Sequence, residues 1–440
     1  MRFLSVGLIC AMGVASAQGV RPKPSDPDQA LNMRGDRLPP IKYKDMTPAQ
    51  RAMADRAIAG RGAIGDFSVI LRSPEMADAM RISRANTSLS AKQSELAILI
   101  NGRYWTSQFE WTVHHRAAVQ AGLSEEAISA IAEGRRPTAL KPDEEPIYNF
   151  LRELMTTHQV SDAAFAAAKG SLGEKGIADL FGLVGFYQVA SLMMNADRYP
   201  MANADQKPEL KPLAQPIPVV GAGFATAPPP GASPPVTKTS TVGKYKLELR
   251  GDRFPGLGYD EMTPGQKAVV DKILSGAIQG GSGGPLNTLL RGPDVAEGVA
   301  RYGEYIRFHS TLPNKLNELA ALITTRFWMA QFPFYAHHRA GTQAGLSETT
   351  ITAIAEGRRP ASMPKDEETV YNFVSGVLKT TQVSDGNFAA TKELLGERNM
   401  IELLGVVGYY QIVSMAVNTD RYPLPEGQAP QLKPLANPLP

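Results

Sequence analysis

The feature that most constrains the fold of this chain is an internal repeat. The segment His114-His115-Arg116 recurs as His337-His338-Arg339, and the numbering offset is 337 − 114 = 223. Three longer segments recur at the same offset: AGLSE at 121–125 and 344–348, IAEGRRP at 131–137 and 354–360, and DRYP at 197–200 and 420–423. Similarity at one fixed spacing is the signature of a repeated structural unit. We therefore predict two tandem copies of one domain.

The second copy is longer than the first. Met46-Thr47-Pro48 matches Met262-Thr263-Pro264 at the smaller offset of 262 − 46 = 216, so the second copy has gained residues before its His-His segment. The glycine-rich stretch Gly280–Gly284 and the segment Tyr305–Ser310 are the natural places for these residues. Glycine clusters usually mark loops and turns. We expect both insertions to alter loops or helix ends.

The chain divides into four predicted segments. Residues 1–17 have the pattern of an export signal peptide, with Arg2 before a short apolar run and Ala15-Ser16-Ala17 as a cleavage site. The first domain spans 18–215 and the second spans 244–440. Between them, 216–243 is a linker rich in Pro, Gly and Ala. The signal predicts a periplasmic or secreted protein.

Composition narrows the choice of partners. The apolar run of the signal is shorter than the roughly 20 residues that a membrane-spanning helix needs. We expect no later segment to be long and apolar enough to span a membrane. The protein should therefore have no membrane partner after the signal is cleaved. The only cysteine, Cys10, lies in the signal, so the mature chain would depend on a buried core instead of disulfides. The net charge of +3 (46 − 43) is spread without basic blocks. We expect a small-molecule substrate and no nucleic acid.

Both copies have helical periodicity. Ser124 is a good N-cap, Ser161 opens a second helix, and the apolar stretch 177–195 is long enough for a buried helix. No segment alternates convincingly like a strand. The predicted fold class is all-α, with each copy a bundle of about six to eight helices.

The histidines point to a candidate site, because four of the six stand in the two His-His segments. Ser107 and Glu110 have the spacing of a capping box, which predicts a helix from Ser107 to Gly122. On it, Glu110 and His114 are four positions apart and share a face. Glu95 lies on the preceding helix, and a helical hairpin would bring it beside His114. A carboxylate that contacts an imidazole fixes its tautomer and raises its basicity, as a proton relay requires.

At these residues the chain resembles the carboxymuconolactone decarboxylase and alkylhydroperoxidase D family. The family pattern falls on Glu95, Ser107, Glu110 and His114 in the first copy and on Glu318, Ala330, Pro333 and His337 in the second. The resemblance is strongest over 95–137 and 318–360. It implies two tandem alkylhydroperoxidase D-like helical bundle domains. Because the family usually forms rings of subunits, it also implies a homo-oligomer of tandem subunits.

The resemblance also carries expectations about chemistry. The redox branch has cysteines at the positions of Ser107 and Glu110, and neither a hydroxyl nor a carboxylate can replace the thiolate of a thiol peroxidase, so that activity is disfavoured. The decarboxylase branch implies a lyase or isomerase acting on a small carboxylated, lactone-like substrate. The catalytic residues would be Glu95, Glu110, His114, Glu318 and His337, and the pocket would be lined by Ser107, Trp105, Trp111 and Trp328. If only one copy is active, we expect the first, which keeps Glu110.

Other interpretations stay open. Glu110 could serve only in the capping box, and a Glu95–His114 pair could be a structural contact, in which case the protein is a non-catalytic binding or assembly module of the same fold. Cofactorless peroxide chemistry is a third alternative. Metal binding by Glu95, Glu110 and His114 is disfavoured because only one histidine per copy faces the right way, so we expect no metal and no cofactor. His115 and His338 are expected to be exposed or used in packing, and His158 and His309 to be solvated.

Overall fold

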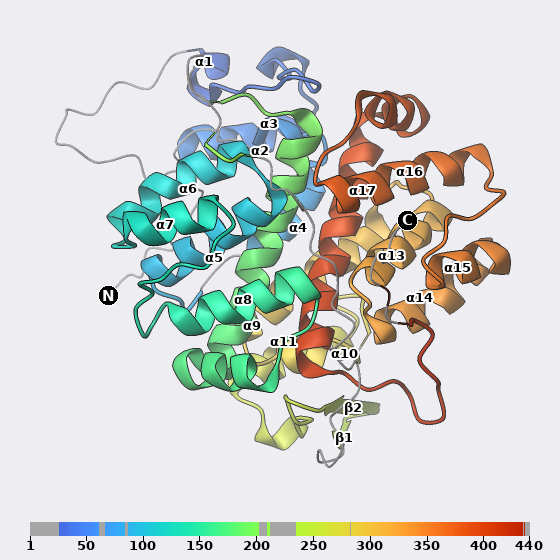
Figure 1. Cartoon of the computed structure of the whole chain (residues 1–440). Helices are drawn as coiled ribbons and strands as arrows, with labels where there is room; N and C mark the ends of the chain where they lie inside the picture. The colour runs from blue at the N-terminus through green and yellow to red at the C-terminus, as the bar shows by residue number, and fades with distance from the viewer. Residues whose placement is uncertain are drawn as a thin grey trace.

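The structure is a computed structural model that describes residues 26–60, 67–83, 87–201, 209–211, 235–281, 283–433 and 435, with the backbone alone for 81–83. The predicted signal peptide, 1–17, and most of the predicted linker, 216–234, lie outside the described residues. Within the described ranges the chain is mainly helical, as the all-α prediction requires. Figure 1 shows the two halves of the chain side by side.

The N-terminal half, 26–201, contains nine described α-helices and one 3-10 turn. These are α1 (Pro27–Leu31), η1 (Tyr43–Asp45), α2 (Pro48–Ala59), α3 (Phe67–Ile70), α4 (Pro74–Ser83), α5 (Ala91–Trp105), α6 (Gln108–Gln120), α7 (Glu125–Ala132), α8 (Glu145–Thr157) and α9 (Asp162–Asp197). The predicted N-caps are confirmed, because the side chains of Ser124 and Ser161 accept hydrogen bonds from the first turns of α7 and α9. Helices α5 and α6 form the predicted hairpin.

The C-terminal half, 235–433, contains eight described α-helices after a β-hairpin. Its helical elements are η2 (Tyr259–Glu261), α10 (Pro264–Leu274), α11 (Leu286–Leu289), α12 (Pro293–Glu304), the π-helical turn η3 (Tyr305–His309), α13 (Asn314–Phe327), α14 (Gln331–Gln343), α15 (Glu348–Ala355), α16 (Lys365–Thr380) and α17 (Asp385–Asp420). The starts of α13, α14, α15 and α17 match those of α5, α6, α7 and α9 at the offset of the repeat, for example 385 − 162 = 223.

The absence of strands was a wrong prediction. Strands β1 (Val236–Val242) and β2 (Tyr245–Gly251) pair antiparallel, and β1 lies within the predicted linker. The turn between them includes Gly243, whose φ of 58° suits a tight hairpin. Val and Thr in β1 are β-branched and favour the extended backbone. A short hairpin therefore forms where composition alone suggested an irregular segment.

Helices α9 and α17 pack against each other in the middle of the molecule (Figure 1). Each is 36 residues long and is interrupted by a glycine with non-helical backbone, Gly173 in α9 and Gly396 in α17. By length and composition each could cross a membrane, contrary to the expectation that no later segment would be long and apolar enough. The most apolar window of α9 is 94% buried inside the protein and that of α17 is 100% buried. Both helices thus form the core shared by the two halves.

Two glycines set the distance between these central helices. A Cβ at Gly185 of α9 would overlap the side chain of Ile412 on α17, and a Cβ at Gly408 of α17 would overlap Val189 on α9. Because glycine lacks a Cβ, each helix can seat a branched side chain of the other against its backbone. The two contacts are reciprocal, and they hold the halves closely together.

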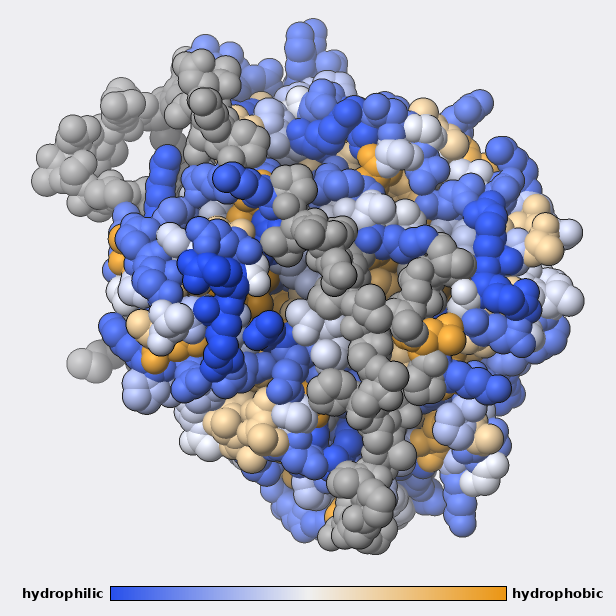
Figure 2. Space-filling model, viewed as in Figure 1, coloured by the Kyte–Doolittle hydropathy of each residue, from blue (hydrophilic) through white to orange (hydrophobic). Residues whose placement is uncertain are grey.

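Polar contacts at the ends of the central helices join the halves as well. Arg37 donates to the backbone oxygen of Val383 at 2.8 Å, and Arg253 donates to the backbone oxygen of Val160 at 2.7 Å. Helix α4 also packs against α12 across the boundary. The face shown in Figure 2 is mainly hydrophilic, with its apolar side chains in separate small areas.

Candidate acid–base site

The carboxylate of Glu95 contacts the imidazole of His114 in the N-terminal half. Glu95 Oε2 lies 2.7 Å from His114 Nδ1, so the predicted contact between α5 and α6 is present. His114 is only 1% exposed, and the ring of Tyr187 from α9 meets it edge-on with centroids 4.9 Å apart. The pair is thus held inside the helical bundle. A catalytic role for it stays a prediction.

Glu110 turns toward His114 instead of closing a capping box. Its Oε2 lies 3.5 Å from His114 Nε2, while the Ser107 side chain makes no capping hydrogen bond. The capping-box prediction was therefore wrong. Ser107 is still the N-cap residue of α6, but it is completely buried and its hydroxyl has no hydrogen-bond partner. The carboxylates of Glu95 and Glu110 lie on opposite nitrogens of one imidazole.

The C-terminal half contains the matching pair. Glu318 Oε2 on α13 lies 2.6 Å from His337 Nδ1 on α14, and the ring of Tyr410 from α17 meets the imidazole edge-on at 4.5 Å. Pro333 stands at the position of Glu110. Because proline has no carboxyl group, it cannot supply Nε2 of His337 with the second carboxylate that His114 has. The two halves therefore share the Glu–His pair and differ in the residue four positions before the histidine, which is Glu110 in the first half and Pro333 in the second.

His337 lines a cavity of about 290 Å³. Its side chain is 12% exposed, against 2% for His114, so the second imidazole is the more accessible one. The wall of the cavity comes from α10, α11, α12, α14, α17 and the loop before α11. A cavity of this size is near the lower end of the range of small-molecule sites. This cavity adjoins the second copy, whereas the sequence favours the first copy as the active one, and which copy is active stays a prediction.

Both segments in which the insertions of the second copy were expected contribute to the wall of this cavity. Four glycines of the stretch Gly280–Gly284 lie on its wall, and so does Arg307 of the π-helical turn η3. Gly284 has a φ of 61°, and a Cβ there would lie 2.7 Å from Cε1 of Phe332. Single π-helical turns often occur at functional sites. The glycine stretch is a loop and η3 follows the end of α12, so both segments lie at a loop or a helix end, beside His337.

Arg307 and Tyr410 bring further polar groups to the cavity. Both the Nε of Arg307 and the hydroxyl of Tyr410 are buried without a hydrogen-bond partner. Burial, followed by the negative charge of Glu318, raises the pKa of Tyr410 well above its usual value, and the charge of Arg307 opposes this. The hydroxyl therefore stays protonated and can donate. A cation, a phenol and an imidazole converge on one small cavity.

Sequence reasoning missed Arg307. A signal for it was present, because Arg84 stands at the same offset from Arg307 as the other repeated residues (307 − 84 = 223). Arg84 lies outside the described residues. An arginine that is repeated in both copies, close to the place where the second copy gains residues, is a candidate for binding an anion.

The four predicted pocket residues lie apart from this cavity. Ser107 lines a larger cavity between the two halves. Trp105 and Trp328 are fully buried at the ends of α5 and α13, and Trp111 donates from Nε1 to Glu209 at 3.0 Å. Their assignment to a substrate pocket stays a prediction.

The remaining histidines divide into exposed and buried ones. His115 contacts Glu209 and Glu125, and although burial lowers its pKa, these carboxylates raise the pKa overall. His338 pairs with Glu348, and the side chain of His309 is 52% exposed. His158 was expected to be solvated, and this was wrong, because it is 1% exposed and packs against the other half. Because the contact of His158 comes from the other half of the chain, the residues near His158 in the sequence do not indicate its burial.

No cluster of three or more His, Cys, Asp and Glu side chains suited to a metal ion is found over the ranges that the structure describes. Comparisons of the chain with protein-family models, with curated proteins and with solved structures found no match.

Proposed function

We propose that this protein is an exported tandem member of the carboxymuconolactone decarboxylase and alkylhydroperoxidase D family, acting as a lyase or isomerase on a small carboxylated, lactone-like molecule. The observation that carries the proposal is that His337, which pairs with Glu318, lines a cavity of about 290 Å³ together with Arg307. The helix starts that match at the offset of the repeat, such as 385 − 162 = 223, support the tandem arrangement. A ring of tandem subunits belongs to the same proposal.

The Glu–His pair supplies the proton transfer. Since Glu318 occupies the Nδ1 side at 2.6 Å, the neutral imidazole carries its proton on Nδ1 and presents the basic Nε2 to a substrate. In an isomerase reaction Nε2 takes a proton from one substrate carbon, and the imidazolium that results returns it to another. In a lyase reaction the imidazolium, protonated beforehand from solvent, gives its Nε2 proton to the carbon that carbon dioxide has left. The carboxylate of Glu318 stabilises the imidazolium in both reactions.

Arg307 supplies the recognition of a carboxylate. Arg307 lines the same cavity, and its Nη2 lies 3.7 Å from where a Cβ of Gly280 would stand. An arginine can bind a carboxylate through two parallel hydrogen bonds, which orients the acid as well as attracting it. The protonated hydroxyl of Tyr410 is available to donate to an enolate oxygen, the group on which charge develops when a proton or carbon dioxide leaves.

The proposal is tested with the mature chain and a panel of small carboxylated lactones. Carbon dioxide release is measured together with the incorporation of solvent deuterium at carbon. We expect His337→Ala to lower the rate by roughly 10² to 10⁴, the usual contribution of a general acid or base, and Glu318→Gln to lower it less. His309→Gln, which alters an exposed histidine, is the control. A rate unchanged in His337→Ala would overturn the proposal.

The variant His114→Ala locates the chemistry. If the cavity of the second copy is the active one, the loss in His337→Ala exceeds that in His114→Ala. A panel member that binds without turnover, as measured by calorimetry, would instead support the non-catalytic binding module.

A further inference from the structure

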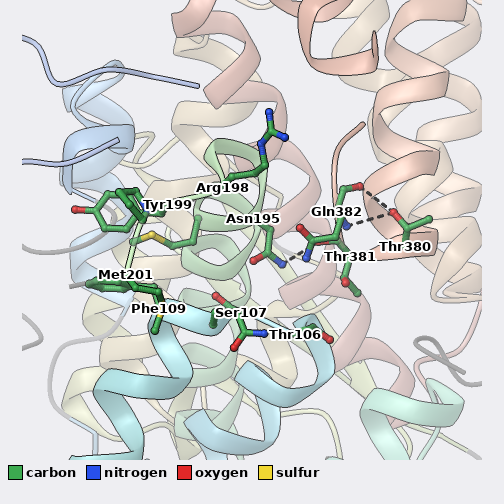
Figure 3. A pocket seen from close by; sticks show the side chains of 13 residues that line it. Thr106, Ser107, Phe109, Asn195, Arg198, Tyr199, Met201, Thr380, Thr381 and Gln382 are labelled. Atoms are coloured by element: carbon green, nitrogen blue, oxygen red, sulfur yellow. Dashed lines mark hydrogen bonds between the residues drawn. The ribbon is translucent and has the colours of Figure 1, made fainter. Parts of the chain in front are cut away.

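A second cavity lies on the boundary between the two halves. It has a volume of about 610 Å³ and shares no lining residue with the cavity beside His337. Its wall joins the start of α6 and the end of α9 to the turn between α16 and α17, which belongs to the other half (Figure 3). Each half therefore supplies one side of it.

The polar part of the wall contains an unpaired donor. Ser107 is completely buried, lines the cavity and has no hydrogen-bond partner for its hydroxyl. Asn195 lies close to it in Figure 3 and uses Nδ2 to hold the backbone oxygens of Trp105 at 2.7 Å and Thr381 at 2.8 Å. A buried hydroxyl without a partner is costly. A bound molecule with one polar group could satisfy it.

The rest of the wall disfavours a charged ligand. Phe109, Met194 and Met201 present apolar surface, and Arg198, the cation that lines the cavity, already contacts Asp385 at 2.6 Å and Asp36 at 3.3 Å. Because two carboxylates neutralise this guanidinium, it offers little attraction to an anion. The lining fits a neutral, mainly apolar molecule.

The other side of the boundary shows what shape of molecule fits. There Asn418 holds the backbone oxygens of Trp328 at 2.7 Å and His158 at 2.9 Å, the same pair of contacts that Asn195 makes. Position 158 corresponds to Thr381 at the offset of the repeat (381 − 158 = 223). The imidazole of His158 lies against Trp328 with centroids 4.4 Å apart. Position 158 thus carries an aromatic ring, whereas the matching position on the wall of the cavity carries the small Thr381.

From this broken symmetry we propose that the cavity at Ser107 and Thr381 binds a small, uncharged aromatic molecule that carries one hydrogen-bonding group. The aromatic ring lies beside Thr381, at the position that matches His158 in the other half. The polar group pairs with the hydroxyl of Ser107. The site is separate from the acid–base cavity and does not depend on the proposed reaction.

The test titrates the full mature chain with 4-fluorophenol and follows the fluorine signal by NMR. We expect saturable binding that Thr381→His abolishes, because this variant places in the cavity the same ring that the chain has at His158. Ser107→Ala should weaken binding roughly three- to tenfold, the range for one neutral hydrogen bond. His337→Ala should leave binding unchanged, which separates this site from the acid–base cavity.

Three outcomes would overturn the proposal: no saturable binding, unchanged binding in a folded Thr381→His variant, or loss of binding in His337→Ala. If Thr381→His does not fold, as judged by circular dichroism, Ser107→Leu fills the cavity from the opposite wall. Unchanged binding in a folded Ser107→Leu variant would overturn it equally.

Discussion

The imidazole of His158 and the indole of Trp328 lie against each other across the boundary between the two halves, with ring centroids 4.4 Å apart and ring planes inclined by 33°. Phe327 meets the same imidazole at 4.7 Å. Burial lowers the pKa of His158 to about 3, although the backbone of Phe327 opposes this. A neutral histidine therefore joins the two halves, and protonating it would place a charge between them.

Stability should depend on pH through His158. Because the pKa is about 3 in the folded protein and 6.5 in the unfolded chain, the unfolded chain binds the proton first as the pH falls. The stability from the neutral ring is present above pH 6.5 and is lost progressively toward pH 3. His158→Phe keeps a ring and removes the titration, so its melting temperature should rise relative to the unmodified protein as the pH falls. His309→Gln, at an exposed site, should not. A difference independent of pH would contradict this.

The contact of α9 with α17 should not tolerate a methyl group at its glycines. Gly185→Ala places its methyl into Ile412, and Gly408→Ala places its methyl into Val189, so each should destabilise the protein by about 1–3 kcal/mol. Gly170 lies on α9 and Gly386 on α17, with nothing within 4 Å of a Cβ. Alanine at either control site should be neutral or stabilise by up to about 1 kcal/mol. Denaturant unfolding of the four variants checks this, and equal effects at all four sites would refute it.

Arg307 should govern the binding of a carboxylate. Under the proposed function, Arg307→Gln removes a charge-assisted pair worth about 1.5–3 kcal/mol, which raises KM roughly 10- to 100-fold for a carboxylated substrate. The amide form of that substrate should not distinguish the variant from the unmodified protein. Steady-state kinetics with the acid and the amide provide the comparison. An equal loss for both would show that Arg307 does not recognise the carboxylate.

Asp420 gives a second pH dependence, of the opposite sign. Burial raises its pKa to about 7, although Phe254 donates a backbone hydrogen bond to it at 2.8 Å. The ordinary pKa of this carboxyl group is 3.8. Between pH 3.8 and about 7 the folded protein therefore binds the proton more tightly than the unfolded chain does. The stability from Asp420 is complete below about pH 4 and declines as the pH rises through 7. Asp420→Asn, which cannot ionise, should therefore gain melting temperature relative to the unmodified protein as the pH rises from the acid side of this window through 7, and a constant difference would exclude the effect.

The helical class, the N-caps Ser124 and Ser161 and the Glu95–His114 contact could be predicted from the sequence. Each of these depends on spacing along one helix or between two consecutive ones, where local chemistry decides the outcome. The roles of Glu95 and His114 in catalysis stay predictions.

Features that depend on distant segments could not be predicted in this way. Ser107 has the correct spacing for a capping box with Glu110, but the proximity of His114 redirects that carboxylate. His158 is buried because α13, from the other half of the chain, brings Trp328 to it. The cavity beside His337 depends on the backbone shape of the glycine stretch Gly280–Gly284 and of η3, and spacing alone does not specify it.

Because both halves belong to one polypeptide, positions 158 and 381 are encoded separately. In a symmetric dimer of identical subunits, one codon would place the same side chain on both sides of the axis. Joining the halves removes that restriction, so a histidine can close one side while a threonine leaves the other open. Covalent linkage in this protein thus permits a specialisation of its two sides that identical subunits could not acquire.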